Sequence, residues 1–264
     1  SELADTPLFL GSYPITPATD ILHELSALKH FDVTTFQAED EIAAVASALG
    51  ASYAGSLGVT SSSGPGIALK TEAIGLAIAT ELPLVIVNSQ RGGPSTGLPT
   101  KTEQSDLYQA VYGRNADAPV PVIAASGPED CFEVAIEAVR TAIRHMTPVF
   151  LLTDGYIANA AGPWAIPDMA SFAPIAAHPA PDAPVPDDQG AVKRALWKRD
   201  PQTLGRPWVA AGAPGLAYRV GGIEKDFGTG DISYEAKNHQ VMTEMRFRKV
   251  RSVAKFIPPQ KVEQ

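Results

Sequence analysis

The chain has 264 residues, of which 45% are apolar and 19% are charged, a composition that fits one large or two smaller globular domains with an ordinary buried core. Its formal net charge of -8 argues against nucleic acid or an anionic membrane surface as the main partner, because both need a basic face. The single cysteine, Cys131, excludes an internal disulfide and an iron–sulfur cluster held by four thiolates of this chain.

The apolar runs and the first residues of the chain bear on the cellular location of the protein. No run approaches the roughly 18 residues that a spanning helix needs, and residues 1–20 lack the basic end and apolar stretch of a signal peptide. Both observations predict a cytoplasmic protein. The sequence begins with Ser1 and its apolar pattern starts almost at once, so we expect a fragment of a longer chain.

Apolar runs of the β type alternate with helical ones over the first 154 residues. Strands are expected at 7–11, 32–39, 56–62, 83–90, 122–126 and 148–154. Helices are expected at 17–28, 41–55, 66–82 and 128–146. The run 83–90 is continuous enough in Leu, Val and Ile to be buried on both faces. This alternation predicts an α/β fold, a parallel sheet with helices on both faces and right-handed crossovers.

The composition changes after the last of these strands. Residues 1–160 are predicted to form the α/β domain, and residues 161–234, rich in Pro, Ala and Gly, an extended linker or wrapping arm. The run 173–188 is a spacer by composition. A charged helical pattern returns at 235–256, and we expect 235–264 to lead to a C-terminal domain that the chain lacks.

Polar loops follow the first four predicted strands. They read YPIT, AEDE, SSSGPG and SQRGGPSTGLPTKTEQSD in chain order. In an open α/β sheet, ligands bind at the carboxyl ends of the strands, where loops open onto helix N-termini. We therefore expect the functional residues in these four loops.

The stretch SSSGPGIALKT (61–71) is close to a phosphate-binding P-loop, but it has Leu69 where that motif has the glycine before its lysine. We therefore expect another kind of turn, in which Ser63 caps a helix, Gly64 allows close backbone approach, and the helix N-terminus attracts an anion or a polar ring. Leu69 is expected to pack and Lys70 to lie beyond the turn. A purely structural turn is the alternative.

Glu41 opens the helix after the second strand. Its neighbours Glu39 and Asp40 favour the helix dipole, which alone explains acidic residues there. However, ten small or apolar residues follow Glu41, so its side chain is expected to lie against the core. Burial there raises a carboxyl pKa, and such an acid is suited to proton exchange with a ring nitrogen.

The longest loop contains one arginine, Arg91, whose planar guanidinium suits a bidentate grip on a carboxylate. Thr96, Thr100 and Lys101 are candidates to support it or to hold a second carboxylate. An ordinary solvated arginine is the alternative. No metal site is predicted, because TDGYIAN (153–159) has too short a spacing for a thiamine-enzyme metal motif and the five histidines form no ligand pair.

Taken together, these loops resemble the alpha subunit of 2-oxoacid:ferredoxin oxidoreductases, most closely the 2-oxoglutarate branch. The resemblance runs from Gly11 to about Tyr156 through YPITPAT, QAEDEIAAVASALGASYAG, SSSGPG and RGGPSTGLPTKTEQSDL, and returns more weakly in GGIEKDFGTGDISYEAKNHQVM. It implies the pyrimidine-binding domain of thiamine-diphosphate enzymes. On this resemblance, we expect the family's extra helix before YPITP, its upstream gamma-type domain and its α/β domain after the last helix to be absent from this sequence or cut short in it.

The resemblance also implies roles for individual residues. Glu41 would bond the aminopyrimidine ring and promote the imino form that generates the thiazolium ylid. Thr16 would contact the substrate C1 carboxylate, with Arg91 as the charged clamp. The remaining assignments are Thr100 as a further substrate contact, Lys101 as a contact from charge alone, Tyr13 and Pro14 as the pocket floor, and Ser63 and Gly64 as the turn that faces thiamine or substrate.

The implied reaction is oxidative decarboxylation of 2-oxoglutarate to succinyl-CoA, with coenzyme A as acyl acceptor and electrons passed to ferredoxin. Thiamine diphosphate would be shared with a beta subunit carrying the pyrophosphate-binding domain, magnesium and an iron–sulfur cluster. A gamma-type domain or subunit would complete the enzyme, so the chain is expected to be inactive alone. Two alternatives remain open: a non-catalytic fragment or interaction module that keeps the fold, and a relative acting on another 2-oxoacid.

Overall fold

Six parallel strands form one sheet in the computed structural model, which describes residues 1–181 and 189–259. The strand order is β2-β1-β3-β4-β6-β5, and every neighbouring pair is parallel. The strands are β1 (Leu8–Ser12), β2 (Val33–Gln37), β3 (Leu57–Ser62), β4 (Leu84–Gln90), β5 (Val122–Ala124) and β6 (Pro148–Asp154). The predicted fold class and all six predicted strands are confirmed.

Seven α-helices are present in the described ranges. They are α1 (Thr19–Ala27), α2 (Glu41–Tyr53), α3 (Gly64–Thr80), α4 (Leu107–Tyr112), α5 (Cys131–His145), α6 (Gln189–Leu196) and α7 (Ala236–Ser252). The sequence did not predict α4 and α6, which are only six and eight residues long. None of the helices in residues 1–181 and 189–259 is long and apolar enough to cross a membrane.

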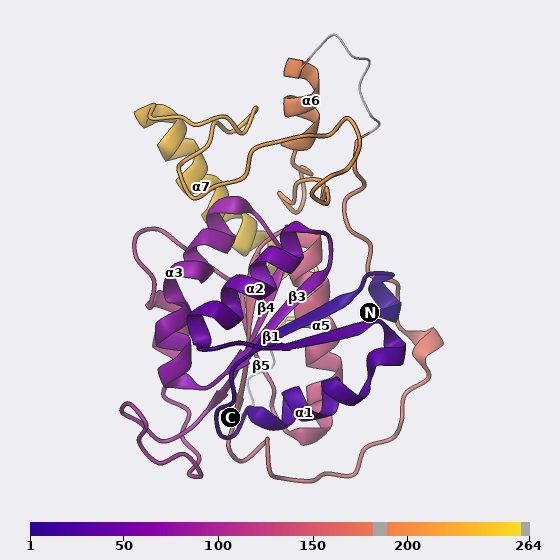
Figure 1. Cartoon of the computed structure of the whole chain (residues 1–264), viewed down its shortest axis with the longest axis vertical. Coiled ribbons are helices and arrows are strands. Elements are labelled where there is room, and N and C mark those ends of the chain that lie inside the picture. Colours follow the sequence, from indigo (N-terminus) through magenta and orange to yellow (C-terminus); the bar gives the residue numbers. More distant parts are fainter. Residues whose placement is uncertain (182–188, 260–264) are drawn as a thin grey trace.

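Two apolar cores lie on opposite faces of the sheet. Side chains of α2 and α3 pack on one face, and those of α1 and α5 pack on the other (Figure 1). Within β4, Leu84 and Ile86 belong to the first core, whereas Val85 and Val87 belong to the second. Because strand side chains alternate between faces, β4 is buried on both, as its sequence predicted.

Helix α2 lies unusually close to β1. Gly11 has no side chain there, and a Cβ atom at this position would collide with the backbone oxygen of Ala44. The close approach therefore requires glycine. It fixes the distance between the sheet and the helix that begins with Glu41.

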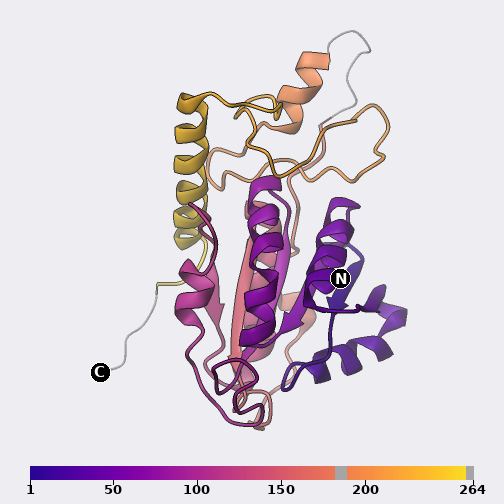
Figure 2. The ribbon, with the colours of Figure 1, turned by 60° about the vertical axis from the view of Figure 1, so that its left-hand side comes forward.

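The segment after α6, residues 197–234, is an arm that packs on the end of α3 and is not a solvated spacer. Arg206 is fully buried, its guanidinium carbon lies 4.8 Å from the Trp197 ring centroid, and it donates to the backbone oxygen of Thr80 at 3.2 Å. Figures 1 and 2 show the arm and α6 at one end of the sheet and the loop after β4 at the opposite end. How these segments divide into domains remains a prediction.

The predicted spacer at 173–188 is only partly correct. Ile175 is buried in the core formed with α1 and α5, and its backbone NH donates to the oxygen of Leu3 at 2.7 Å. This residue is therefore anchored to the sheet domain. The remainder of that run, 182–188, and the chain end, 260–264, lie outside the described residues.

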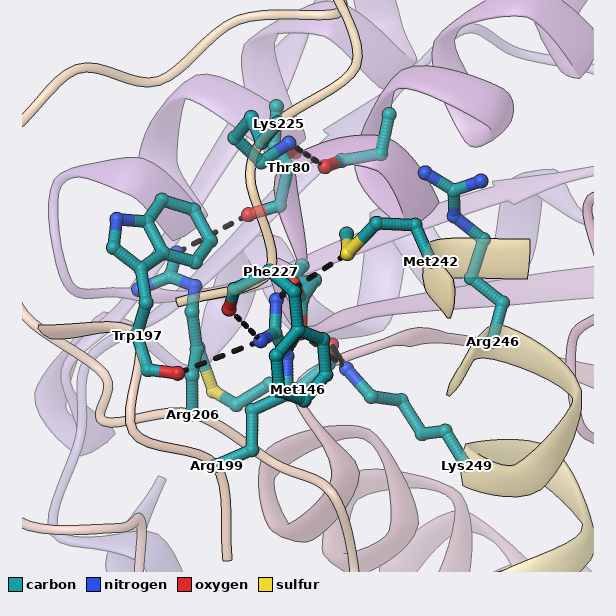
Figure 3. Close-up of polar contacts among 12 residues, drawn as sticks. Thr80, Met146, Trp197, Arg199, Arg206, Lys225, Phe227, Met242, Arg246 and Lys249 are labelled. Atoms are coloured by element: carbon teal, nitrogen blue, oxygen red, sulfur yellow. Dashed lines mark hydrogen bonds and ion pairs between the residues drawn. The ribbon is translucent and has the colours of Figure 1, made fainter. Parts of the chain in front are cut away.

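A buried ion cluster holds the arm and α7 against α3. Glu81, which caps α3, accepts from Arg199 of the arm at 2.5 and 3.0 Å and from Nζ of Lys249 in α7 at 2.7 Å. Figure 3 shows the two cations reaching in from these separate segments. All three side chains are at most 4% exposed.

The charges in this cluster are strongly coupled. Burial by itself would raise the pKa of Glu81, but Arg199 and Lys249 hold it well below its usual range. Burial also lowers the pKa of Lys249 to about 8, because one carboxylate is shared by two cations and does not fully compensate the ammonium. Glu81 is therefore the anion on which both attachments depend.

We expect Glu81→Gln to lower the free energy of unfolding by about 3 to 5 kcal/mol, because it leaves two buried cations without a counter-charge. Asp231→Asn is the matched control, since the Lys193–Asp231 pair is also close, at 2.9 Å, but its side chains are 44% and 55% exposed. It should change stability little. Urea unfolding of the two variants measures the difference, and equal losses would contradict the importance of the buried cluster.

Candidate functional site

The carboxyl ends of β1, β3 and β4 are adjacent in the sheet and carry polar residues. β1 ends at Ser12, whose hydroxyl lies 3.0 Å from that of Ser61 in β3. These hydroxyls are buried. The loops after these strands therefore start from one edge of the sheet.

Glu41 is the first residue of α2 and lies against the start of α3. Asp40 caps α2, its carboxylate accepting from the backbone NH of Ala43 at 2.7 Å. A Cβ atom at Gly66 would come within 2.9 Å of Cγ and 3.1 Å of Oε1 of Glu41, and would collide with the Ser62 hydroxyl. The structure thus brings together the acid and the SSSGPG turn, and the partly buried Glu41 fits beside α3 only because residue 66 has no side chain.

The turn before α3 presents two buried hydroxyl groups. Ser63 is the N-cap residue in an extended conformation, but its side chain makes no capping bond, so the predicted cap is wrong. Ser62 and Ser63 are fully buried, and within the described chain neither hydroxyl has a hydrogen-bond partner. Because buried polar atoms are nearly always satisfied, these two hydroxyls at a helix N-terminus are suited to a polar ligand.

The packing of α3 differs from the prediction in one respect. Leu69 is 53% exposed, whereas Lys70 is fully buried. The buried positions of the helix recur at Gly66, Lys70, Ala73 and Ala77, which is one face of an α-helix. Leu69 points away from that face, so its expected packing role is wrong.

Lys70 contacts the backbone of the candidate acid. Its ammonium donates to the backbone oxygen of Glu41 at 3.0 Å and to Oγ1 of Thr60 at 3.1 Å. Burial lowers the pKa of Lys70 to about 8, although the nearby carboxylates of Glu41 and Asp40 act in the opposite direction. The sequence had contained a signal for this burial, because Lys70 follows Gly66 by four residues along an otherwise small and apolar helix face.

Arg91 connects two loops. Its Nη1 donates to the backbone oxygen of Thr16 at 2.7 Å and its Nη2 to that of Thr96 at 3.0 Å. The side chain is mostly buried, and within the described residues Nε has no partner. The guanidinium therefore braces the loop after β1 against the loop after β4, and its Nε–H group makes no bond within the described residues.

The remaining predicted residues fall into different places. Thr16 and Thr100 line a cavity of about 440 Å³, together with Asn159 and Tyr156. A second cavity, of about 590 Å³, is lined by Gly64 and Arg91. Tyr13 is 37% exposed, Pro14 is half-buried and Lys101 is exposed, and none of the three is among the residues that line these two cavities.

Asp106 also reaches the start of α3, and sequence reasoning assigned it no role. Asn88 of β4 donates to its Oδ2 at 3.0 Å, and that oxygen would lie 2.7 Å from a Cβ at Gly64. Burial raises the pKa of Asp106. The residue lies within the predicted loop motif, but only the folding of that loop over α3 brings its carboxyl group to the turn.

The TDGYIAN stretch is a structural turn, as predicted. Oδ1 of the buried Asp154 accepts from the backbone NH groups of Tyr156 and Ile157 at 2.7 and 2.9 Å, directly after β6. In residues 1–181 and 189–259, no three His, Cys, Asp or Glu side chains lie close enough together to hold a metal ion.

Comparison with known proteins places this geometry in a family context. The family described as "Pyruvate flavodoxin/ferredoxin oxidoreductase, thiamine diP-bdg" matches residues 3–196. The 2-oxoglutarate oxidoreductase subunit KorA of Mycobacterium tuberculosis is 56% identical over 250 residues, which is 94% of this chain and 37% of that protein. The 2-oxoglutarate synthase subunit KorA of Archaeoglobus fulgidus is 41% identical over 162 residues, 61% of this chain and 47% of that protein.

A solved structure resembles the chain over nearly its whole length. It is the 2-oxoglutarate:ferredoxin oxidoreductase from Magnetococcus marinus with 2-oxoglutarate, coenzyme A and succinyl-CoA bound. The TM-score is 0.85 and the identity 36%, covering 99% of this chain and 45% of that one. The chain thus spans less than half the length of each of these three proteins.

We expect Arg91→Lys to lower the free energy of unfolding by about 1 to 3 kcal/mol, because a lysine keeps the charge but does not bridge two carbonyl oxygens in a fixed fork. Arg248→Lys is the control, since Arg248 is exposed on α7. Urea unfolding compares the two. A loss for Arg91→Lys no larger than that for the control would show that the brace contributes nothing to stability.

Proposed function

Because the chain belongs to the thiamine-diphosphate-binding family of pyruvate flavodoxin/ferredoxin oxidoreductases, we propose that it is the pyrimidine-binding part of the alpha subunit of a 2-oxoglutarate oxidoreductase. The observation that carries the proposal is the contact of Glu41 with the turn before α3, where two buried serine hydroxyls have no partner in the described chain. The identity of 56% to the Mycobacterium tuberculosis subunit favours 2-oxoglutarate over other 2-oxoacids.

The residues at this turn fit the aminopyrimidine ring of thiamine diphosphate. The ring carries nitrogen atoms that accept and donate hydrogen bonds, and Glu41 would hold a proton shared with one of them. Ser62, Ser63 and the first NH groups of α3 would bond the remaining polar atoms. When bound, the cofactor supplies the electron sink for decarboxylation, while this chain supplies orientation and proton control.

The cavity of about 440 Å³ is the proposed place for the substrate. Thr16 and Thr100 both line it, and Lys101 lies between Thr100 and Thr102, another lining residue. We assign the two threonines to hydrogen bonds with the substrate and Lys101 to a carboxylate. Arg91 would act mainly by holding the Thr16 carbonyl in place, with its Nε–H as a further donor. Tyr13 and Pro14 line neither cavity, and they are assigned only to the loop that leads from β1 to Thr16.

The complete reaction requires other chains or segments. The relatives are named as subunits, and the Magnetococcus marinus structure contains coenzyme A and succinyl-CoA. We assign magnesium, the iron–sulfur cluster and the diphosphate site to a beta subunit, and ferredoxin and a gamma-type domain or subunit to the working complex. Ile42 and Leu69, both 53% exposed, lie beside Glu41 and Lys70 in sequence and are suited to cover by the beta subunit. The complex is proposed to be cytoplasmic.

The activity is tested with the assembled complex, thiamine diphosphate, magnesium, coenzyme A and 2-oxoglutarate, by following reduction of a viologen dye. We expect Glu41→Gln to lower the rate by about 100-fold or more, because the amide does not exchange the proton. Glu39→Gln, an exposed neighbour, should behave as wild type. The same assay with pyruvate or a branched-chain 2-oxoacid in place of 2-oxoglutarate identifies the substrate class. If the wild-type complex oxidises no 2-oxoacid, the enzyme proposal fails and the non-catalytic alternative stands.

A second test uses two glycines of the same helix. We expect Gly66→Ala to weaken thiamine diphosphate binding about 10-fold or more, because the new methyl group displaces Glu41 or Ser62. Gly75→Ala meets nothing closer than 3.8 Å, so it should leave binding unchanged and stabilise the helix by about 0.5 to 1 kcal/mol. Calorimetric titration of the complex measures the affinity for thiamine diphosphate. If Gly66→Ala and Gly75→Ala bind it equally tightly, the proposal that the aminopyrimidine ring binds at this turn is wrong.

A further inference from the structure

Lys70 is a fully buried ammonium on a helix face that is otherwise small and apolar. Its neighbours on that face include Ile67, Ala73 and Ile74, all at most 8% exposed. A buried charge is costly unless it is compensated, and a leucine or methionine would fill the same space without that cost. The lysine is therefore explained by its polar contacts and not by packing.

Those contacts join three elements at one point. Lys70 belongs to α3. Its ammonium donates to Thr60 of β3 and to the backbone oxygen of Glu41, the first residue of α2. One helical turn earlier, Gly66 lies against the carboxylate of the same glutamate. Helix α3 thus holds Glu41 twice, by its backbone through Lys70 and by its side chain at Gly66.

The charge of Lys70 is coupled to the same glutamate. The groups that act on its ammonium are Glu41 and, more weakly, Asp40, both from the start of α2, and both favour the charged form of the lysine. The two carboxylates at the start of α2 thus offset part of the cost of burying the ammonium.

We propose that Lys70 is a positioning residue for Glu41: through its bonds to the Glu41 backbone oxygen and to Thr60, it fixes the first turn of α2 against β3 and α3 and so holds the carboxylate at the start of α3. The role in catalysis rests on the proposed function of Glu41. The contact with the α2 backbone does not, and is testable without a cofactor.

The first experiment compares Lys70→Met with Lys249→Met in the full chain. Lys249 is also a fully buried lysine whose pKa is lowered to about 8, but it contacts Glu81 at the far end of α3. Amide hydrogen exchange is followed by mass spectrometry in a peptide covering residues 41–49. We expect faster exchange there in Lys70→Met only, even if both variants melt at lower temperature.

The second experiment measures thiamine diphosphate affinity in the assembled complex. Lys70→Met should weaken binding about 10- to 100-fold, because the first turn of α2 no longer holds Glu41 in place. In a Glu41→Gln background the substitution should weaken binding much less. Lys249→Met should leave the affinity unchanged.

The outcomes separate this inference from the proposed function. Unchanged exchange at residues 41–49 in Lys70→Met overturns the positioning role, whatever the complex binds. If Lys70→Met binds thiamine diphosphate as tightly as the wild-type complex, its role in cofactor binding is overturned. If the wild-type complex binds no thiamine diphosphate, the proposed function fails, and the exchange result still decides whether Lys70 holds α2.

Discussion

The position of the first turn of α2 against β1, β3 and α3 is the constraint on which the candidate site depends. The chain leaves β1, forms the edge strand β2, and returns through α2 to β3 on the other side of β1. This return carries Glu41 back over the centre of the sheet, beside the point where the strand order reverses direction, which is where open α/β sheets bind ligands. Gly11 permits the close approach of α2 and Lys70 fixes its start.

Helix α3 is anchored by buried charge at both ends. Near its start Lys70 bonds α2 and β3, and at its end Glu81 binds the arm and α7. Lys70 and Glu81 are separated by roughly 16 Å along the helix axis. The buried residues between them are alanines, isoleucines and Thr80, which pack closely but give few directional contacts. The charged groups thus define the axial position of α3, and the turn that faces Glu41 follows from it.

The sequence predicted the parts of the fold that depend on local pattern. The alternation of β-type apolar runs with helical ones identified all six strands, whereas α4 and α6 were missed because they are too short for a period to emerge. The meeting of Glu41 with the SSSGPG turn followed from the rule that loops gather at the carboxyl edge. The hydrogen bonds of Arg91 could not be predicted from the sequence. Thr16 is 75 residues away, and its carbonyl comes within reach only when both loops are folded. Lys70 lies on the helix beyond the turn, as predicted, whereas the packing role of Leu69 was wrong because the buried face of α3 includes Lys70 and not Leu69.

Under the proposed function, this chain supplies only part of the groups that the reaction needs. It has an acid, unpartnered hydroxyls and a helix N-terminus within the described residues, all suited to a polar ring, but no cluster of ligands for the metal that a diphosphate needs. Ile42, the residue after the acid, is 53% exposed. A proton shared between a carboxylate and a ring nitrogen is best controlled where water is excluded, and the exposed side chain beside Glu41 is suited to cover by another surface. Under the proposed function, the subunit that supplies the metal would therefore also cover the site. Association of the two subunits would then both complete the cofactor site and exclude water from it.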